Sequence, residues 1–143
     1  MSTALTPYLH FRGQAREAMT FYQSVLGGQL DVMTFSDMGD AGGMGLGEDE
    51  AGLVMHSALT VSESVCLMGA DVPRHMEGDL ANGHVALSGD DVETLRGWYD
   101  GLAAGGDVEM PFEKAPWGAW FGSVVDRYGV SWMVNAADSS AAG

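Results

Sequence analysis

The segment LHFRGQAREAMTFYQSVLGG at residues 9–28 returns in altered form as HVALSGDDVETLRGWYDGLAAGG at residues 84–106. Each copy begins with a short apolar run, typical of a strand, and continues with apolar residues at helical spacing. A pair of glycines then ends each helix, because glycine adopts the left-handed conformation after a helix at little steric cost. Gly13 corresponds to Gly89, an offset of 76 residues (89 − 13), or about half of the chain. This internal repeat predicts a duplicated structural unit.

The two predicted helices each carry one apolar face. The first helix covers residues 14–26. The second begins at Asp90, which forms a pattern typical of a capping box with Glu93 three residues later. The apolar faces are Ala15, Ala18, Met19, Tyr22, Val25 and Leu26 in the first helix, and Val92, Leu95, Tyr99, Leu102 and Ala103 in the second.

Three further runs with the composition of strands follow each helix. They are residues 29–35, 53–61 and 64–69 in the first half, and residues 107–112, 119–126 and 130–135 in the second. Each half is therefore predicted to be a β-α-β-β-β module. One helix covers one face of a sheet, so the two sheets are expected to pack together with the helices outside. The predicted fold class is α+β, with two tandem modules forming a cupped, barrel-like mixed sheet whose concave interior holds a ligand.

The chain is expected to form a single domain over residues 1–143. Its parts are module 1 at 5–69, a linker at 70–82, module 2 at 83–136 and a C-terminal tail at 137–143. Residues 36–52 hold six glycines and five acidic residues, so they bury too little apolar area to offset their ordering entropy. We predict a mobile loop there; the alternative is a lid that orders over a ligand.

Composition excludes several classes of protein. A net charge of −14 repels phosphate backbones and anionic lipids, so neither nucleic acid nor a membrane is an expected partner. No apolar run approaches the roughly 20 residues that cross a bilayer, and the N-terminus lacks the layout of a signal peptide. A cytoplasmic protein is therefore expected. Cys66 is the only cysteine, which excludes an internal disulfide.

The most specific stretch of the sequence is WGAWFGSVVDRYGVSWMVN at residues 117–135. It is accompanied by PYLHFRG (7–13), Glu17-Ala18, Phe21-Tyr22, Leu26-Gly27-Gly28, MHSAL (55–59) and LMGAD (67–71). With the repeated module, these landmarks resemble the vicinal oxygen chelate superfamily, which includes glyoxalase I, extradiol dioxygenases and bleomycin- and fosfomycin-resistance proteins. Within it, the chain is most similar to the PhnB-like branch. Such proteins often carry a demethylubiquinone methyltransferase label, but no glycine-rich nucleotide loop follows a strand here to hold S-adenosylmethionine.

The resemblance implies four positions for metal ligands, on the first and last strands of each module. In members that use a metal, these positions hold His or Glu and leave open sites for vicinal substrate oxygens. Here they fall at Pro7, at Leu67 or Met68, at His84 and at Met133. Only His84 is suited to a divalent cation, and one side chain does not hold such an ion firmly. No cofactor is therefore expected; if a divalent metal binds, His84 is its ligand.

Three histidines on predicted strands, His10, His56 and His84, are candidates for ligand contact. Imidazole titrates near neutrality and serves as base or ligand, although a lone histidine on a strand is often a hydrogen-bonded structural residue. The residues predicted to share a side with them are Tyr8 and Arg12 for His10, and Val54, Ala58 and Thr60 for His56. Spacing alone pairs no carboxylate with a histidine, so catalytic residues stay unassigned. Asp126 precedes a turn and is expected to cap backbone amides.

Aromatic and methionine side chains gather in the last third of the chain. Trp120 alternates with Phe121, so one is expected to face the interior and the other the helix layer or a neighbouring subunit. Packing in the core is the alternative interpretation of these aromatic residues. Methionines supply adaptable walls. The predicted ligand contacts are His10, His56, His84, Met68, Trp117, Trp120, Phe121 and Met133.

Three classes of function remain open. The leading hypothesis is a protein that binds an apolar or aromatic small molecule without a catalytic metal. The alternative is a metal-dependent lyase, isomerase or dioxygenase that uses His84 with other histidines or carboxylates. A purely structural or interaction domain is the third. Superfamily members usually form homodimers, and we expect one here.

Overall fold

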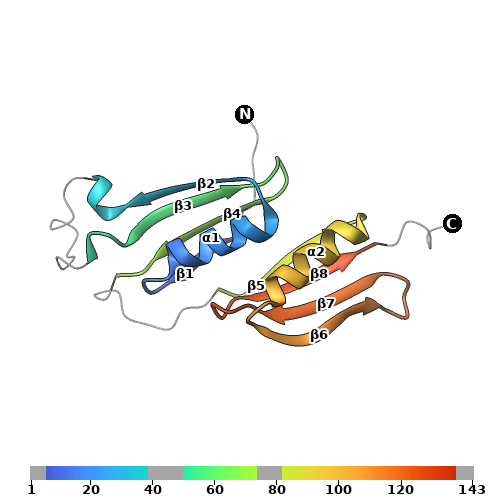
Figure 1. Ribbon diagram of the computed structural model, residues 1–143. Helices are drawn as coiled ribbons and strands as arrows, with labels where there is room; N and C mark the ends of the chain where they lie inside the picture. Colours follow the sequence, from blue (N-terminus) through green and yellow to red (C-terminus); the bar gives the residue numbers. More distant parts are fainter. Residues whose placement is uncertain (1–5, 39–49, 74–81, 138–143) are drawn as a thin grey trace. The chain divides into compact units, whose positions relative to one another are not determined.

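The computed structural model describes residues 6–38, 50–73 and 82–137. The chain divides into two compact units, Met1–Asn82 and Gly83–Gly143, and each contains one βαβββ module (Figure 1). The first runs β1 (Tyr8–Phe11), α1 (Ala15–Leu26), β2 (Gln29–Thr34), the 3-10 helix η1 (Phe35–Met38), β3 (Val54–Thr60) and β4 (Cys66–Asp71). The second runs β5 (His84–Gly89), α2 (Val92–Ala103), β6 (Asp107–Lys114), β7 (Trp120–Val125) and β8 (Ser131–Ala136). The predicted α+β class and the duplication are confirmed.

Both modules have the same strand order. The first sheet is ordered β1-β4-β3-β2 and the second β5-β8-β7-β6. In each, the first and last strands of the module pair in parallel and the remaining neighbours are antiparallel. Each sheet is therefore mixed and open, with one helix lying across it (Figure 1). The packing of the two sheets around a shared interior stays a prediction.

The helix of the first module packs through the predicted apolar face. Ala15, Ala18, Met19, Tyr22 and Leu26 are buried, because these positions recur on one side of an α-helix. Gly27 and Gly28 follow with φ values of 81° and 90°, which favour glycine. A Cβ at Gly28 would collide with the carbonyl oxygen of Thr60, so the residue also permits close packing of the chain against the end of β3.

The second helix begins one residue later than predicted. Asp91, not Asp90, is the N-cap: its Oδ1 accepts from the backbone N–H of Thr94 at 3.2 Å. The hydroxyl of Thr94 donates to Asp91 Oδ2 at 2.7 Å. The capping-box pattern with Glu93 favoured Asp90, but either of two adjacent aspartates can cap a helix, and the second does so here.

The last strand of the first module begins and ends two residues later than predicted. β4 reaches Asp71, where the linker was expected to start at residue 70. The buried Asp71 carboxylate accepts hydrogen bonds from the backbone N–H groups of Gly13 (2.8 Å), Ala15 (3.0 Å) and Val54 (3.0 Å). These bonds tie the start of α1 and the start of β3 to the end of β4. Asp71 therefore belongs to the first module and not to the linker.

Two predicted segments lie mostly outside the described residues. The loop or lid at 36–52 is described only at its two ends, and the linker is described only at residues 70–73 and 82. No helix among the described parts of the chain is long and apolar enough to span a membrane.

Candidate functional site

Strand alternation divides the side chains of β1 between two faces of the first sheet. Leu9 and Phe11 lie under α1 and are 1% and 2% exposed, whereas Tyr8 is 40% exposed. We call the face opposite α1 the open face of the first sheet. His10 lies on it with Tyr8, because side chains two residues apart on a strand share a face. Arg12 follows the end of β1.

Strand pairing places further side chains beside Tyr8 on the open face. Tyr8 pairs with Met68, Met68 with Ala58, and Ala58 with Asp31, which makes one row across all four strands. The register of β4 is thereby decided, because Met68 lies on the open face and Leu67 is buried on the opposite one.

A β-bulge in β3 places Val54 and His56 on opposite faces of the first sheet. Met33 pairs with His56, but the next residue, Thr34, pairs with Val54, so Met55 is an extra residue on β3. Neighbouring residues of β2 point to opposite faces, so their partners do too. His56 therefore shares the open face with Met33, while Val54 is buried under the helix. The prediction that His56 and Val54 share a side is wrong, because alternation fails at a bulge.

Tyr8, His10 and His56 form what we call the tyrosine–histidine cluster. The ring centroids of Tyr8 and His10 are 5.3 Å apart, and those of Tyr8 and His56 are 5.8 Å apart. The Tyr8 hydroxyl and Nδ1 of His56 share a hydrogen bond of 3.2 Å. Burial raises the pKa of the Tyr8 phenol above its usual 10.0, so the hydroxyl keeps its proton at neutral pH. The cluster combines flat ring surface with groups that donate and accept hydrogen bonds.

The backbone of β1 at His10 is fixed by a side chain. The N–H of His10 donates to Asn82 Oδ1 at 2.8 Å, and Asn82 Nδ2 donates to the carbonyl oxygen of His10 at 3.1 Å. An edge strand otherwise presents such backbone groups to solvent. The Asn82 amide therefore takes the place of a neighbouring strand and holds the position from which His10 projects.

The second sheet has an open face of its own, opposite α2. His84 pairs with Ser131, and Ala86 pairs with Met133, which in turn pairs with Ser123. Phe121 lies on the same face, because it alternates with Trp120 and Gly122, which lie on the helix side. This face brings together the predicted contacts His84, Phe121 and Met133.

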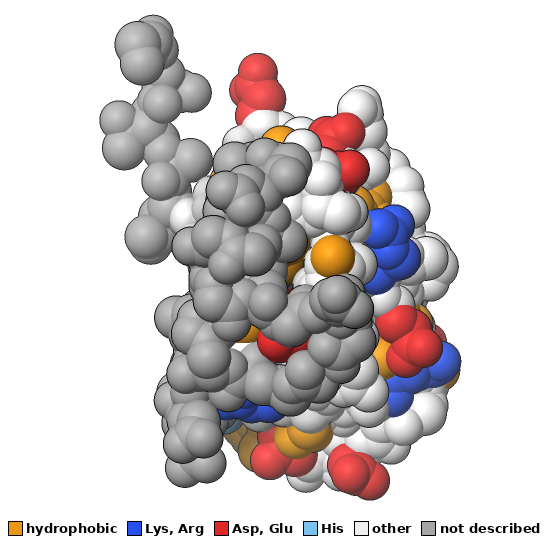
Figure 2. Space-filling view, turned by 90° about the vertical axis from the view of Figure 1, so that its left-hand side faces the viewer, with side chains coloured by type: hydrophobic (Ala, Val, Ile, Leu, Met, Phe, Trp, Pro, Cys, Tyr) orange, Lys and Arg blue, Asp and Glu red, His pale blue; other side chains and the backbone are white. Residues whose placement is uncertain are grey.

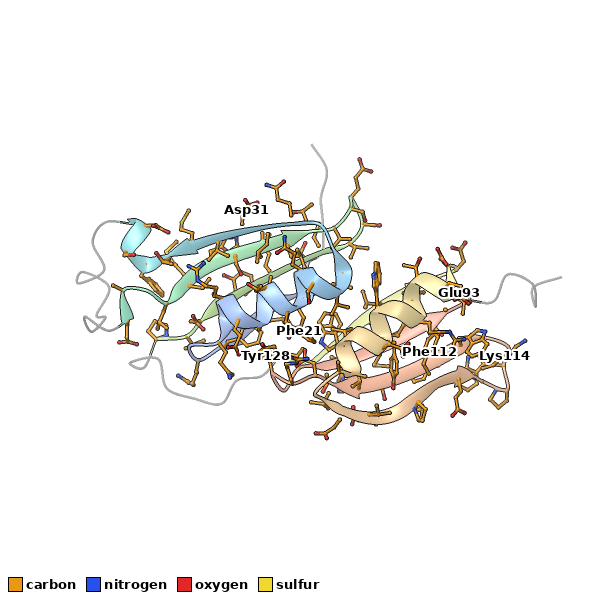
Figure 3. All side chains as sticks on the ribbon, viewed as in Figure 1. Phe21, Asp31, Glu93, Phe112, Lys114 and Tyr128 are labelled. Carbon is orange, nitrogen blue, oxygen red and sulfur yellow. The ribbon has the colours of Figure 1, made fainter. Side chains whose placement is uncertain are left out.

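Trp120 lies in the helix layer of the second module, not on its open face. The guanidinium carbon of Arg96, on α2, is 4.7 Å from the centroid of the Trp120 ring. Phe112 stacks on the Trp120 ring with centroids 5.8 Å apart, and Tyr99 stacks on Phe112 at 5.5 Å. Figure 3 labels Phe112 beside α2. Trp117 lies between β6 and β7 and is 70% exposed. The sequence placed both tryptophans among ligand contacts, and neither shares a sheet face with Phe121.

The positions that the resemblance assigns to metal ligands hold a donor set that does not fit a divalent cation. Pro7 precedes β1, and the adjacent residue on the open face is Tyr8, which is bonded to His56. Met68 and Met133 offer thioethers, which are weak ligands for hard cations. Within 6–38, 50–73 and 82–137, no three His, Cys, Asp or Glu side chains group as metal ligands. No chemical step is therefore derived through a metal.

Three residues of the first open face, Tyr8, Asp31 and Met33, are absent from the predicted contacts. Tyr8 is signalled by its alternation with Leu9. Asp31 and Met33 lie on β2, and only the pairing of β2 with β3 shows which face they occupy. Acidic side chains elsewhere are dispersed over the face that Figure 2 presents, with basic side chains between them. Asp31 is distinguished from such surface charge by its place in the row of Tyr8.

Comparison with known proteins gives two agreeing results at the level of sequence. Residues 5–134 match the family model described as the Glyoxalase/Bleomycin resistance protein/Dioxygenase superfamily. Protein YjdN of Escherichia coli strain K12 is 30% identical over 139 residues, which cover 92% of this chain and 93% of the relative.

Solved structures with the same fold cover nearly the whole chain. The structure of protein PA1353 from Pseudomonas aeruginosa has a TM-score of 0.80 and 33% identity, and the match covers 96% of this chain and all of that one. The PhnB protein from Bacillus cereus, which bears a provisional 3-demethylubiquinone-9 3-methyltransferase label, has a TM-score of 0.70 and 27% identity. That match covers 94% of this chain and 100% of the other.

Proposed function

Because the chain belongs to the glyoxalase/bleomycin resistance protein/dioxygenase superfamily, we propose that it binds a flat apolar or aromatic small molecule on the open face of its first sheet, without a catalytic metal. The observation that carries the proposal is the tyrosine–histidine cluster in its setting of methionines. The methyltransferase label of the Bacillus cereus relative is not part of this proposal.

The surroundings of the cluster suit an apolar ring. Met33 is 42% exposed and pairs with His56, and Met68 pairs with Tyr8, so thioethers flank the cluster on β2 and β4. Thioether side chains adapt to irregular shapes and make favourable contacts with aromatic rings. A ring stacked on Tyr8 would gain about 0.5–1.5 kcal/mol beyond the burial of its area. A ligand that covers exposed tyrosine and methionine side chains removes their apolar surface from water. This favours binding of the ligand to the open face.

Methionine methyl groups provide a direct test within one molecule. We expect titration of methyl-labelled protein with fluorenone, a flat neutral ring compound, to shift the NMR signals of Met33 and Met68. Met19, buried on the helix side of the same sheet, is the internal control and should not shift. Shifts confined to Met19, or none at any methionine, would contradict the proposed location.

Substitution tests the contribution of the cluster to this binding. We expect Tyr8→Ala to weaken fluorenone binding about 5- to 10-fold through loss of stacking. Tyr128→Phe, in the turn between β7 and β8, is the control and should bind like the wild type. Equal affinities of the Tyr8 variant and the wild type would show that the cluster is not part of the binding site.

Calorimetric titration with Mn²⁺ and Zn²⁺ tests the metal-free part of the proposal. The expected result is no stoichiometric binding tighter than about 10 μM. Tight binding that His84→Ala abolishes would instead support the metal-dependent enzyme of the same superfamily.

A further inference from the structure

The two nitrogens of His56 have different surroundings. Nδ1 is engaged by the Tyr8 hydroxyl at 3.2 Å, whereas no hydrogen-bond partner of Nε2 is found among the residues that the structure describes. His56 is half-buried, so part of its ring reaches solvent on the open face. A polar atom at such a place is available to a ligand.

The direction of the hydrogen bond between Tyr8 and His56 is linked to the position of the imidazole proton, because Nδ1 accepts only when it carries no proton. A protonated phenol has one proton to donate, and His56 Nδ1 is its partner in the described parts of the chain. A neutral imidazole that accepts at Nδ1 carries its proton on Nε2. With the Tyr8 hydroxyl as the donor, the cluster presents an N–H donor, not an acceptor, to the open face.

The neighbours of His56 leave this donor accessible and disfavour negative charge next to it. Ala58, two residues along β3, has only a methyl group, which is too short to cover the imidazole. Asp31 pairs directly with Ala58, so its carboxylate stands on the same face. The nearby carboxylate repels an anionic ligand, and the net charge of −14 adds to that effect at long range.

We propose that the ligand of the first open face carries a neutral carbonyl oxygen, which accepts a hydrogen bond from Nε2 of His56, and that Tyr8 holds the imidazole in the tautomer that makes this bond. This inference rests on the proposed function and adds the chemical class of the ligand to it. Tyr8 acts here as a positioning residue, and Asp31 selects against anions.

The tautomer is measured without any ligand. We expect ¹⁵N NMR of the wild type with a neutral imidazole to show the form protonated at Nε2. In Tyr8→Phe, which keeps the ring but removes the hydroxyl, the signals should move toward a mixture of the two forms. Tyr128→Phe, which removes a hydroxyl outside the cluster, is the control and should leave the His56 signals unchanged. A wild type protonated at Nδ1 would overturn the inference.

Matched ring compounds test the ligand class. We expect fluorenone to bind about 3- to 10-fold more tightly than fluorene, which lacks the carbonyl, the difference typical of one neutral hydrogen bond. His56→Phe should erase this preference, and Tyr128→Phe, outside the open face, should keep it. A fluorenone carboxylate should bind more weakly than fluorenone, and Asp31→Asn should reduce that penalty.

The outcomes separate the two proposals. Equal binding of fluorenone and fluorene, or a preference that survives in His56→Phe, would overturn the carbonyl inference and leave the aromatic binding function standing. Failure of all three compounds to bind would contradict the proposed function, while the NMR measurement would still decide the tautomer.

Discussion

At the scale of single residues, Asp126 shows how one carboxylate organises a turn. Its Oδ1 accepts from the backbone N–H groups of Tyr128 (2.8 Å) and Val130 (3.1 Å), and its Oδ2 accepts from Trp132 Nε1 at 2.8 Å. The predicted capping of backbone amides is confirmed. The tryptophan partner adds a link from the turn to the core, since Trp132 is fully buried.

We expect Asp126→Ala to lower the free energy of unfolding by about 3 kcal/mol, because it leaves buried donors without an acceptor. Urea denaturation followed by tryptophan fluorescence measures the change. Asp126→Asn is the matched control: its amide oxygen replaces one carboxylate oxygen, so its loss should be smaller. A loss below about 1 kcal/mol in the alanine variant would show that water satisfies these donors instead.

At the scale of elements, the start of α2 depends on a single side chain. Hydrogen bonds from the hydroxyl and the backbone N–H of Thr94 lower the pKa of Asp91 below its usual 3.8. A carboxyl group with a lowered pKa in the folded state stabilises the fold above the pKa of the unfolded state. That contribution is lost as the pH falls through the folded pKa.

Asp91→Ala should therefore be less stable than the wild type at pH 7, and the difference should shrink as the pH falls below about 4. Thermal unfolding followed by circular dichroism over this pH range is the measurement. Asp90→Ala is a matched control, because Asp90 is the adjacent aspartate and does not cap the helix. Equal destabilisation by the two substitutions would point to net charge instead of capping.

Asp71 joins three elements of the first module through one carboxylate. We expect Asp71→Ala to cost about 3 kcal/mol of stability and to accelerate hydrogen exchange of the amides of Gly13, Ala15 and Val54. The amide of Leu95, at the start of α2, is the comparison. Its hydrogen exchange should be no faster than the lower global stability of the variant accounts for. Uniform acceleration at all four amides would indicate global unfolding without a local effect.

At the scale of the whole molecule, the two modules share a topology but not an open face. The offset of 76 residues that relates Gly13 to Gly89 also relates Tyr8 to His84 (84 − 8). Tyr8 pairs with Met68, and His84 pairs with Ser131. Duplication thus preserved the backbone pairing while the side chains that a ligand would meet diverged.

A homodimer remains our expectation for the molecule in solution. Val108 and Met110 are each 51% exposed on the edge strand β6, and apolar side chains on an unpaired edge favour association. Sedimentation at about 100 μM should give twice the mass of the chain, and Met110→Lys should shift the equilibrium toward monomer. A wild type that sediments only as monomer would contradict this expectation.

The predictions that held rest on local patterns. The helix faces around Met19 and Tyr99, and the glycines that follow each helix, were predictable because helical periodicity and backbone conformation depend on neighbours within a few residues. The shared face of His10 and Tyr8 and that of His56 and Ala58 followed from simple alternation. The face of Val54 did not, because the extra residue Met55 breaks the alternation and nothing local marks it. Alternation put Trp120 and Phe121 on opposite faces, but it did not show which of them faces α2.

The sequence by itself therefore determined the duplicated βαβββ architecture and the family resemblance, since both are written in short-range periodicity and repeated spacing. Only the tertiary structure decided that Tyr8 and His56, 48 residues apart, share a hydrogen bond, and that Trp120 faces α2. Those contacts depend on strand register. Register is set by the pairing of strands distant in the chain, so no single stretch of sequence contains it.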